Sequence, residues 1–131
     1  LTPHPGEAAR LLDNSVSDIQ KDRLGSISKL SESYSANILL KGKYSLIQDL
    51  NNDIPFMITS GNPGMATAGM GDLLTGVTCS LLGQFGTEDS AKITSIAAHV
   101  HSKSGDLASH QGERGMIASD LLTYIRELVN P

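Results

Sequence analysis

The chain has 131 residues, a length that suits one domain or part of one. Hydrophobic residues make up 39% and charged residues 18%, which is typical of a soluble globular protein. The net charge of -4 argues against nucleic acid as a partner, yet leaves phosphate ligands open because backbone N–H groups bind phosphate. Cys79 is the only cysteine, which excludes an internal disulfide and favours a cytoplasmic location. No apolar run has membrane-spanning length, so we expect no membrane partner.

The first residues, Leu1 to Pro5, lack an initiating Met and have the character of a strand end that enters a loop. We therefore expect residues 1–131 to be part of a single domain whose N-terminal part is missing. Pro5 and Glu7 suit the start of a short helix. A second helix is expected from Val16 to about Ser33, because its apolar residues are spaced along one face.

Short strands are expected next. The continuous apolar run at 37–41 predicts a strand that is covered on both faces. Gly42 and Lys43 form a turn, and the alternating segment 44–48 is its hairpin partner. A turn at 51–53 precedes another strand at 55–59.

The rest of the chain is expected to be mainly helical. Residues 73–82 are apolar nearly all round, which predicts a buried helix with Cys79 as a small core residue. A long helix follows from 88 to 101 or beyond, then a partly loop-like segment at 105–115 and a last helix at 118–129. Helices beside short apolar strands indicate an α/β fold.

The glycine-rich stretch from Gly61 to Asp72 lies between the last predicted strand and the apolar helix. The first N–H groups of a helix have no internal acceptor, and the helix dipole favours negative charge there. We expect the N–H groups of Gly69, Met70 and Gly71 to bind one phosphate, since glycine allows close approach of the backbone.

Asp72 follows these N–H groups directly. A phosphate repels a carboxylate, so Asp72 adds no affinity, but it is well placed to accept a proton from a hydroxyl that attacks phosphorus. An aspartate in the first turn of a helix has a second interpretation, as a cap or dipole partner. The adjoining Gly69–Gly71 favours the catalytic interpretation.

This stretch resembles the ribokinase-like superfamily, whose hallmark is Gly-x-Gly-Asp at the start of a buried helix. The closer resemblance is to the ADP- or ATP-dependent NAD(P)H-hydrate dehydratases. It is carried by Thr2–Glu7, by Gly61–Thr67 running into Gly69–Asp72, and more loosely by Leu39–Gly42. The resemblance implies the C-terminal half of a ribokinase-like layered α/β/α domain, with a short sheet flanked by helices.

The resemblance also implies a metabolite-repair lyase. Such an enzyme phosphorylates the C6 hydroxyl of hydrated NADH or NADPH from ADP or ATP with Mg²⁺, and phosphate then leaves. It implies that Asp72 contacts the hydrate and acts as base, and that His4 contacts the hydrate. The implied nucleotide-binding residues are Lys41, Gly42, Lys43, Tyr44, Ser45, Gly69, Met70 and Gly71. Lys43 and Tyr44 are bulkier than the residues often found there.

The implied partners are the hydrate and ADP, with a homo-oligomer in the intact protein and a fused or separate NAD(P)H-hydrate epimerase. Two alternatives stay open. The first is a ribokinase-like kinase for a sugar or vitamin, against which Thr2–Glu7 argues. The second is an inactive nucleotide-binding module.

Other polar residues have mainly structural interpretations. Glu7 is expected to cap the first helix or orient His4, with capping favoured, and Asn62 and Thr67 to fix the loop through backbone hydrogen bonds. No set of metal ligands is predicted, because His99, His101 and His110 lack a Glu or Cys at ligand spacing. Asp106 has no obvious partner in the sequence, and Asp120 is expected to be a helix-dipole partner.

Overall fold

The computed structural model describes residues 1–130. These residues divide into two compact units, which are described separately. Unit 1 comprises Leu1–Thr59 and Asp89–Lys92, and unit 2 comprises Ser60–Glu88 and the described residues from 93 to 130.

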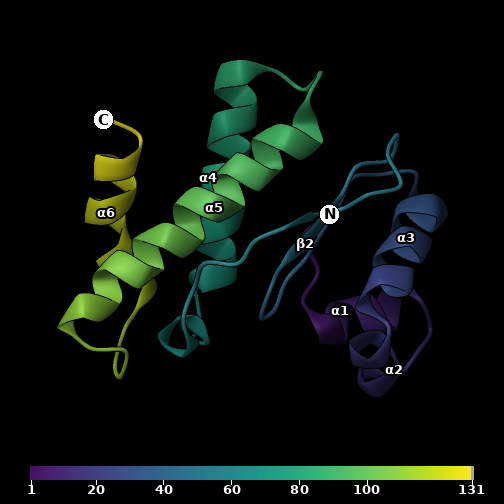
Figure 1. Cartoon of the computed structure of the whole chain (residues 1–131), viewed down its shortest axis with the longest axis horizontal. Coiled ribbons are helices and arrows are strands. Elements are labelled where there is room, and N and C mark those ends of the chain that lie inside the picture. The colour runs from purple at the N-terminus through teal and green to yellow at the C-terminus, as the bar shows by residue number, and fades with distance from the viewer. Residues whose placement is uncertain (131) are drawn as a thin grey trace. The chain divides into compact units, whose positions relative to one another are not determined.

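Unit 1 combines helices with a small sheet (Figure 1). Its helices are α1 (Pro5–Leu11), α2 (Val16–Lys21) and α3 (Arg23–Tyr34), and its strands are β1 (Ile38–Leu40), β2 (Leu46–Gln48) and β3 (Phe56–Met57). The strands are antiparallel in the order β1-β2-β3, and Leu39 pairs with Ile47. The predicted hairpin is confirmed.

The first residues of the chain run alongside β1. The Leu1 amino group donates to the Asn37 carbonyl at 2.9 Å, and Leu39 N–H donates back to the Leu1 carbonyl at 2.8 Å. Lys41 N–H donates to the Pro3 carbonyl at 2.9 Å. This pattern of hydrogen bonds is that of a parallel ladder, so residues 1–3 pair with β1 although they are not part of an assigned strand. His4 follows directly after this pairing.

The core of unit 1 lies between the helices and the sheet. All three residues of β1 are buried, as predicted, and α3 packs against β1 and β2. The core side chains are apolar and come from every helix of the unit: Ala8, Ala9, Ile19, Ile27, Leu30, Ile38, Leu40 and Leu46. This packing holds α1 and the end of β1 in fixed relation to each other.

The prediction of one helix over 16–33 is wrong. The chain breaks at Asp22, whose backbone (φ -136°, ψ 76°) ends α2 and begins α3. The Asp22 side chain accepts from Gly25 N–H at 2.8 Å, which caps α3. Aspartate competes for backbone donors in this way, so apolar spacing alone did not reveal the break.

Unit 2 is helical. It contains the 3₁₀ turn η1 (Pro63–Met65), α4 (Met70–Phe85) and most of α5 (Ser90–Ala108), then η2 (Ser109–Gln111), η3 (Ala118–Asp120) and α6 (Leu121–Leu128). A core cluster joins the start of α4 to the C-terminal elements through Met70, Ala108, Met116 and Leu121. The long helix α5 ends at Ala108, so it extends past 101, as the sequence allowed. It includes the first residues of the segment 105–115, which was predicted to be partly loop-like.

Two predictions about α4 are wrong. The helix is not buried all round, because its buried residues form one stripe, Met70, Leu74 and Thr78, spaced four apart. Cys79 lies beside this stripe and is exposed rather than a core residue. An apolar composition permits burial of a helix but does not supply the neighbours that cover its other faces.

Among residues 1–130, no helix is long and apolar enough to cross a membrane.

Candidate active site: a capped histidine, a buttressed turn and a glycine-rich loop

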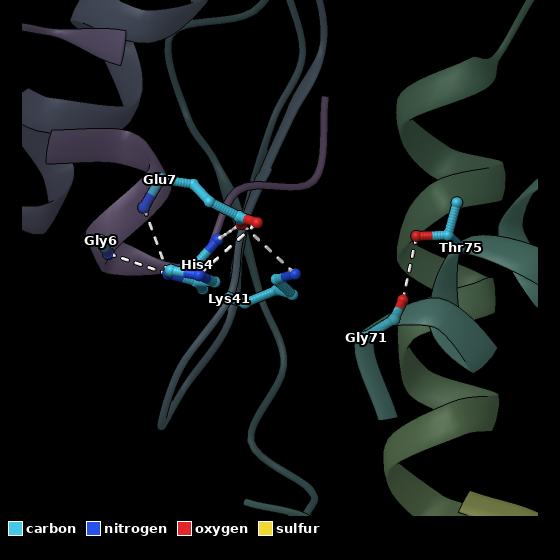
Figure 2. Close-up of polar contacts among 6 residues, drawn as sticks. All are labelled: His4, Gly6, Glu7, Lys41, Gly71 and Thr75. Atoms are coloured by element: carbon cyan, nitrogen blue, oxygen red, sulfur yellow. Dashed lines mark hydrogen bonds and ion pairs between the residues drawn. The ribbon is translucent and has the colours of Figure 1, made fainter. Parts of the chain in front are cut away.

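His4 is the N-cap of α1. Its Nδ1 atom accepts from Gly6 N–H at 3.0 Å and Glu7 N–H at 3.2 Å, and Glu7 Oε2 accepts from His4 N–H at 2.6 Å. This reciprocal capping box satisfies backbone donors that the helix leaves without partners. The predicted capping role of Glu7 is confirmed, and Figure 2 shows the arrangement.

The Glu7 carboxylate also lies between His4 and Lys41 (Figure 2). Its Oε1 atom is 3.5 Å from His4 Nε2, and its Oε2 atom is 3.6 Å from Lys41 Nζ. The hydrogen bond from the His4 backbone is the largest cause that lowers the pKa of Glu7, and the charge of Lys41 lowers it further, against the raising effect of burial. A negative carboxylate therefore orients both the imidazole and the ammonium group.

The segment Lys41–Ser45 forms the tight turn between β1 and β2. Tyr44 has a φ of 57°, in the left-handed region that costs a non-glycine residue about 1 kcal/mol. Ser45 Oγ donates to the Gly42 carbonyl at 3.1 Å, and Lys43 Nζ lies 5.3 Å from the centre of the Tyr44 ring. All five predicted residues thus belong to one compact turn.

Arg23, which the sequence analysis did not single out, supports this turn from α3. Its Nη2 atom donates to the carbonyls of Leu40 at 3.2 Å and Tyr44 at 3.4 Å, and its Nη1 atom donates to the Lys41 carbonyl at 3.4 Å. Partial burial lowers the pKa of Arg23. Only long-range contact reveals this role, because Arg23 lies far from the turn in sequence.

In unit 2, the glycine-rich loop is fixed by polar side chains. Asn62 Oδ1 accepts from Gly64 N–H at 3.0 Å, which confirms its predicted loop-forming role. Asp106 on α5 accepts from the backbone of Gly61 and the side chain of Asn62. Asp106 thus has a partner that its sequence neighbours did not indicate. The role of Thr67 stays a prediction.

The loop ends at Gly69, the N-cap of α4. Gly69 has a φ of 85°, which a residue with a Cβ rarely adopts. Helix geometry leaves the N–H groups of the first turn without intrahelical acceptors. Asp72 lies in this turn with an exposed side chain. Thr75 Oγ1 donates to the Gly71 carbonyl at 3.0 Å (Figure 2).

His101 on α5 contacts the same end of α4. Its side chain is buried, and its ring is hydrogen-bonded to the backbone of Met70. This contact raises the pKa of His101, whereas its Nε2 atom is buried without a hydrogen-bond partner. Burial is the larger effect and lowers the pKa of His101 to about 4. The three histidines are interpreted from the sequence as structural or surface residues, and this is confirmed: His101 is buried, and His99 and His110 are exposed.

Across residues 1–130, no three His, Cys, Asp or Glu side chains are grouped so that they could hold a metal ion. No residue of this chain is therefore assigned as a Mg²⁺ ligand. Asp120 lies at the start of α6, where its Oδ2 atom accepts from Ile117 N–H at 2.9 Å. That bond caps the 3₁₀ turn η3, whose last residue is Asp120, and the Asp120 side chain makes no cap hydrogen bond to α6. The role of Asp120 as a helix-dipole partner stays a prediction.

Solved structures share this fold. An ADP/ATP-dependent NAD(P)H-hydrate dehydratase from Bacillus subtilis, co-crystallised with ATP and Mg²⁺, superimposes with a TM-score of 0.90 at 27% identity. The match covers 98% of this chain and 46% of that protein. A ribokinase-like superfamily protein from Enterococcus faecalis matches with a TM-score of 0.77 at 28% identity, over 99% of this chain and 44% of the other. The predicted ribokinase-like α/β fold is confirmed.

Sequence comparison gives the family. A family model described as NAD(P)H-hydrate dehydratase matches residues 1–127, so the chain belongs to this family. The bifunctional NAD(P)H-hydrate repair enzyme Nnr of Coxiella burnetii is 44% identical, over 100% of this chain and 26% of that protein. The ADP-dependent (S)-NAD(P)H-hydrate dehydratase of Neisseria meningitidis is 45% identical, over 64% of this chain and 28% of that protein. The chain thus spans about a quarter of the length of these curated relatives.

Proposed function

We propose that the chain contributes to nucleotide-dependent dehydration of hydrated NADH or NADPH, a metabolite-repair reaction. The observation that carries the proposal is the exposed Asp72 carboxylate in the first turn of α4, directly after the glycine-rich loop. Such a helix start favours an anionic ligand, and a carboxylate beside it accepts a proton during phosphoryl transfer. Membership of the family supports the identity of the substrate.

The proposed reaction has two steps. The C6 hydroxyl of the hydrate attacks the terminal phosphorus of ADP, its proton passes to Asp72, and AMP leaves. The ring nitrogen then expels phosphate from C6, and the C5 proton passes to solvent water, which restores the double bond. Phosphate is a far better leaving group than hydroxide, which is why phosphorylation precedes elimination.

Each predicted site residue has a role in this proposal. In unit 2, Asp72 is the base and contacts the hydrate, and Gly69, Met70 and Gly71 offer N–H groups to phosphate. In unit 1, His4 contacts the hydrate, and the turn Lys41–Ser45 binds the nucleotide. Support for His4 comes from its exposed imidazole, held by the capping box.

The proposal extends to the setting of the chain. Both units belong to one ribokinase-like domain, which is supported by a family match that runs through both. The phosphoryl donor is ADP or ATP, with Mg²⁺ bound, and bifunctional relatives support an associated epimerase. We also propose a homo-oligomer and a cytoplasmic location, the latter because the composition includes a single cysteine.

The test is incubation of the protein with ADP, Mg²⁺ and hydrated NADH, both as this chain and within any longer protein that carries it. Recovery of the near-ultraviolet absorbance of NADH, together with release of AMP and phosphate, is the expected result. A stable phosphorylated product would indicate a small-molecule kinase instead. Binding of ADP without turnover would indicate a non-catalytic nucleotide-binding module.

A further inference from the structure

The glycine-rich loop is attached to α5 through one carboxylate. Gly61 N–H donates to Asp106 Oδ1 and Oδ2, both at 3.1 Å, and Asn62 Nδ2 donates to Oδ1 at 3.3 Å. Hydrogen bonds to an ionised acceptor are about twice as strong as those between neutral groups. Asp106 therefore accepts hydrogen bonds from both the backbone and a side chain at the start of the loop.

The residue before Asp106 makes a second attachment. Gly105 is buried, and a Cβ built on it would lie 2.8 Å from two carbon atoms of the Met65 side chain. The Met65 side chain therefore occupies the space that a larger residue at 105 would fill. Met65 also packs against the cluster that contains Met70, the first residue of α4. The two attachments hold successive parts of the loop on the same turn of α5.

We propose that Asp106 is a positioning residue, which sets the path of the loop and thereby the direction of the N–H groups at the start of α4. Its two donors, Gly61 and Asn62, lie at the entrance of the loop, and Gly69 lies at its end. The part of this inference that concerns nucleotide binding rests on the proposed function. Asp106 acts through the loop, whereas Asp72 and the helix N–H groups act on the ligand.

The experiment compares Asp106→Ala and Asp106→Asn with wild type in the full chain. The first readout is hydrogen exchange of the Gly61 and Gly64 amides by NMR, which needs no ligand. The second is the Kd for ADP with Mg²⁺. The control is Lys103→Ala, an exposed residue on the same helix.

Removal of the carboxylate is expected to speed Gly61 exchange by roughly tenfold or more, since an amide exchanges once its acceptor is lost. ADP binding is expected to weaken roughly 10- to 100-fold, because small misplacement of binding groups is costly. Asp106→Asn keeps one acceptor oxygen and is expected to fall between wild type and Asp106→Ala. Lys103→Ala is expected to change neither readout.

The possible contrary outcomes are distinct. Unchanged Gly61 exchange in Asp106→Ala would overturn the attachment itself. Faster exchange with unchanged ADP affinity would overturn its role in positioning the nucleotide site. If wild type bound no ADP, the proposed function would fail, while the exchange data would still decide whether Asp106 sets the loop.

Discussion

The imidazole of His4 and the carboxylate of Glu7 cap each other's backbone N–H groups, at 3.2 Å and 2.6 Å. Because Nδ1 of His4 is the acceptor, the neutral ring carries its proton on Nε2. Glu7 Oε1 lies 3.5 Å from that atom. The Nδ1 atom of His4 thus caps the first turn of α1, and its Nε2 atom is a hydrogen-bond donor directed away from the backbone.

The capping role of His4 and its proposed contact with the hydrate can be separated by substitution. His4→Asn keeps a side-chain acceptor for the cap and loses the Nε2 donor, whereas His4→Ala loses both. We expect only His4→Ala to lower the free energy of unfolding, by about 1 kcal/mol. Both variants are expected to weaken binding of the hydrate by about 0.5–1.5 kcal/mol, with little effect on ADP.

Denaturant unfolding and separate titrations of hydrate and ADP check this prediction. Equal weakening of both ligands would indicate a general structural role for the turn. Selective loss of ADP binding would place His4 at the nucleotide end of the site.

Asp72→Asn is expected to abolish most turnover while nucleotide binding and stability are kept. The side chain is exposed, so the fold does not depend on it, and loss of a general base costs on the order of 10²–10⁴ in rate. Single-turnover assays and an ADP titration are the measurements. A variant with near-normal turnover would show that Asp72 is not the base.

Substitution of two glycines of α4 is expected to have different effects, on ADP binding at Gly71 and on stability at Gly76. Gly71→Val is expected to weaken ADP binding, because a branched side chain intrudes where backbone N–H groups meet phosphate. Gly76 is the matched control, since a Cβ there would meet nothing within 4 Å. Gly76→Ala is expected to raise stability by about 1 kcal/mol and leave ADP affinity unchanged.

Calorimetric titration and thermal unfolding distinguish these effects. Unchanged ADP affinity in a folded Gly71→Val protein would rule out phosphate binding at this helix start.

Local patterns in the sequence predicted most elements but not what covers them. The strand at Ile38–Leu40 and its hairpin partner followed from an apolar run and a Gly-containing turn. The break at Asp22 did not, because a side-chain cap outweighed apolar periodicity. The exposure of Cys79 was missed because burial depends on neighbouring elements.

The candidate site shows the same division. Gly69–Asp72 and the capping role of Glu7 are local patterns and could be recognised directly. Arg23 and Asp106 act on carbonyl and N–H groups that lie 17 or more residues away in sequence. No local pattern identifies such a partner, so these supporting residues emerged only from the folded chain.

The pH dependence of stability is expected to report on His101. The pKa of His101 in the folded chain, about 4, lies below the ordinary 6.5. As the pH falls, His101 is therefore protonated in the unfolded chain before it is protonated in the folded chain. The stabilisation is complete above pH 6.5 and is lost as the pH falls toward 4, at about 1.4 kcal/mol per pH unit. Between pH 7 and pH 5, the titration of His101 is expected to lower the free energy of unfolding of the wild type by about 2 kcal/mol.

His101→Asn isolates this contribution, because asparagine keeps a polar side chain for the contact with the Met70 backbone but does not titrate. Urea unfolding at pH 7 and pH 5 is measured for both proteins, and carboxylates and exposed histidines contribute equally to each. Wild type is expected to lose about 2 kcal/mol more than the variant. Equal losses would mean that His101 is protonated in the folded chain at pH 5, and that its ring is not held neutral against the start of α4.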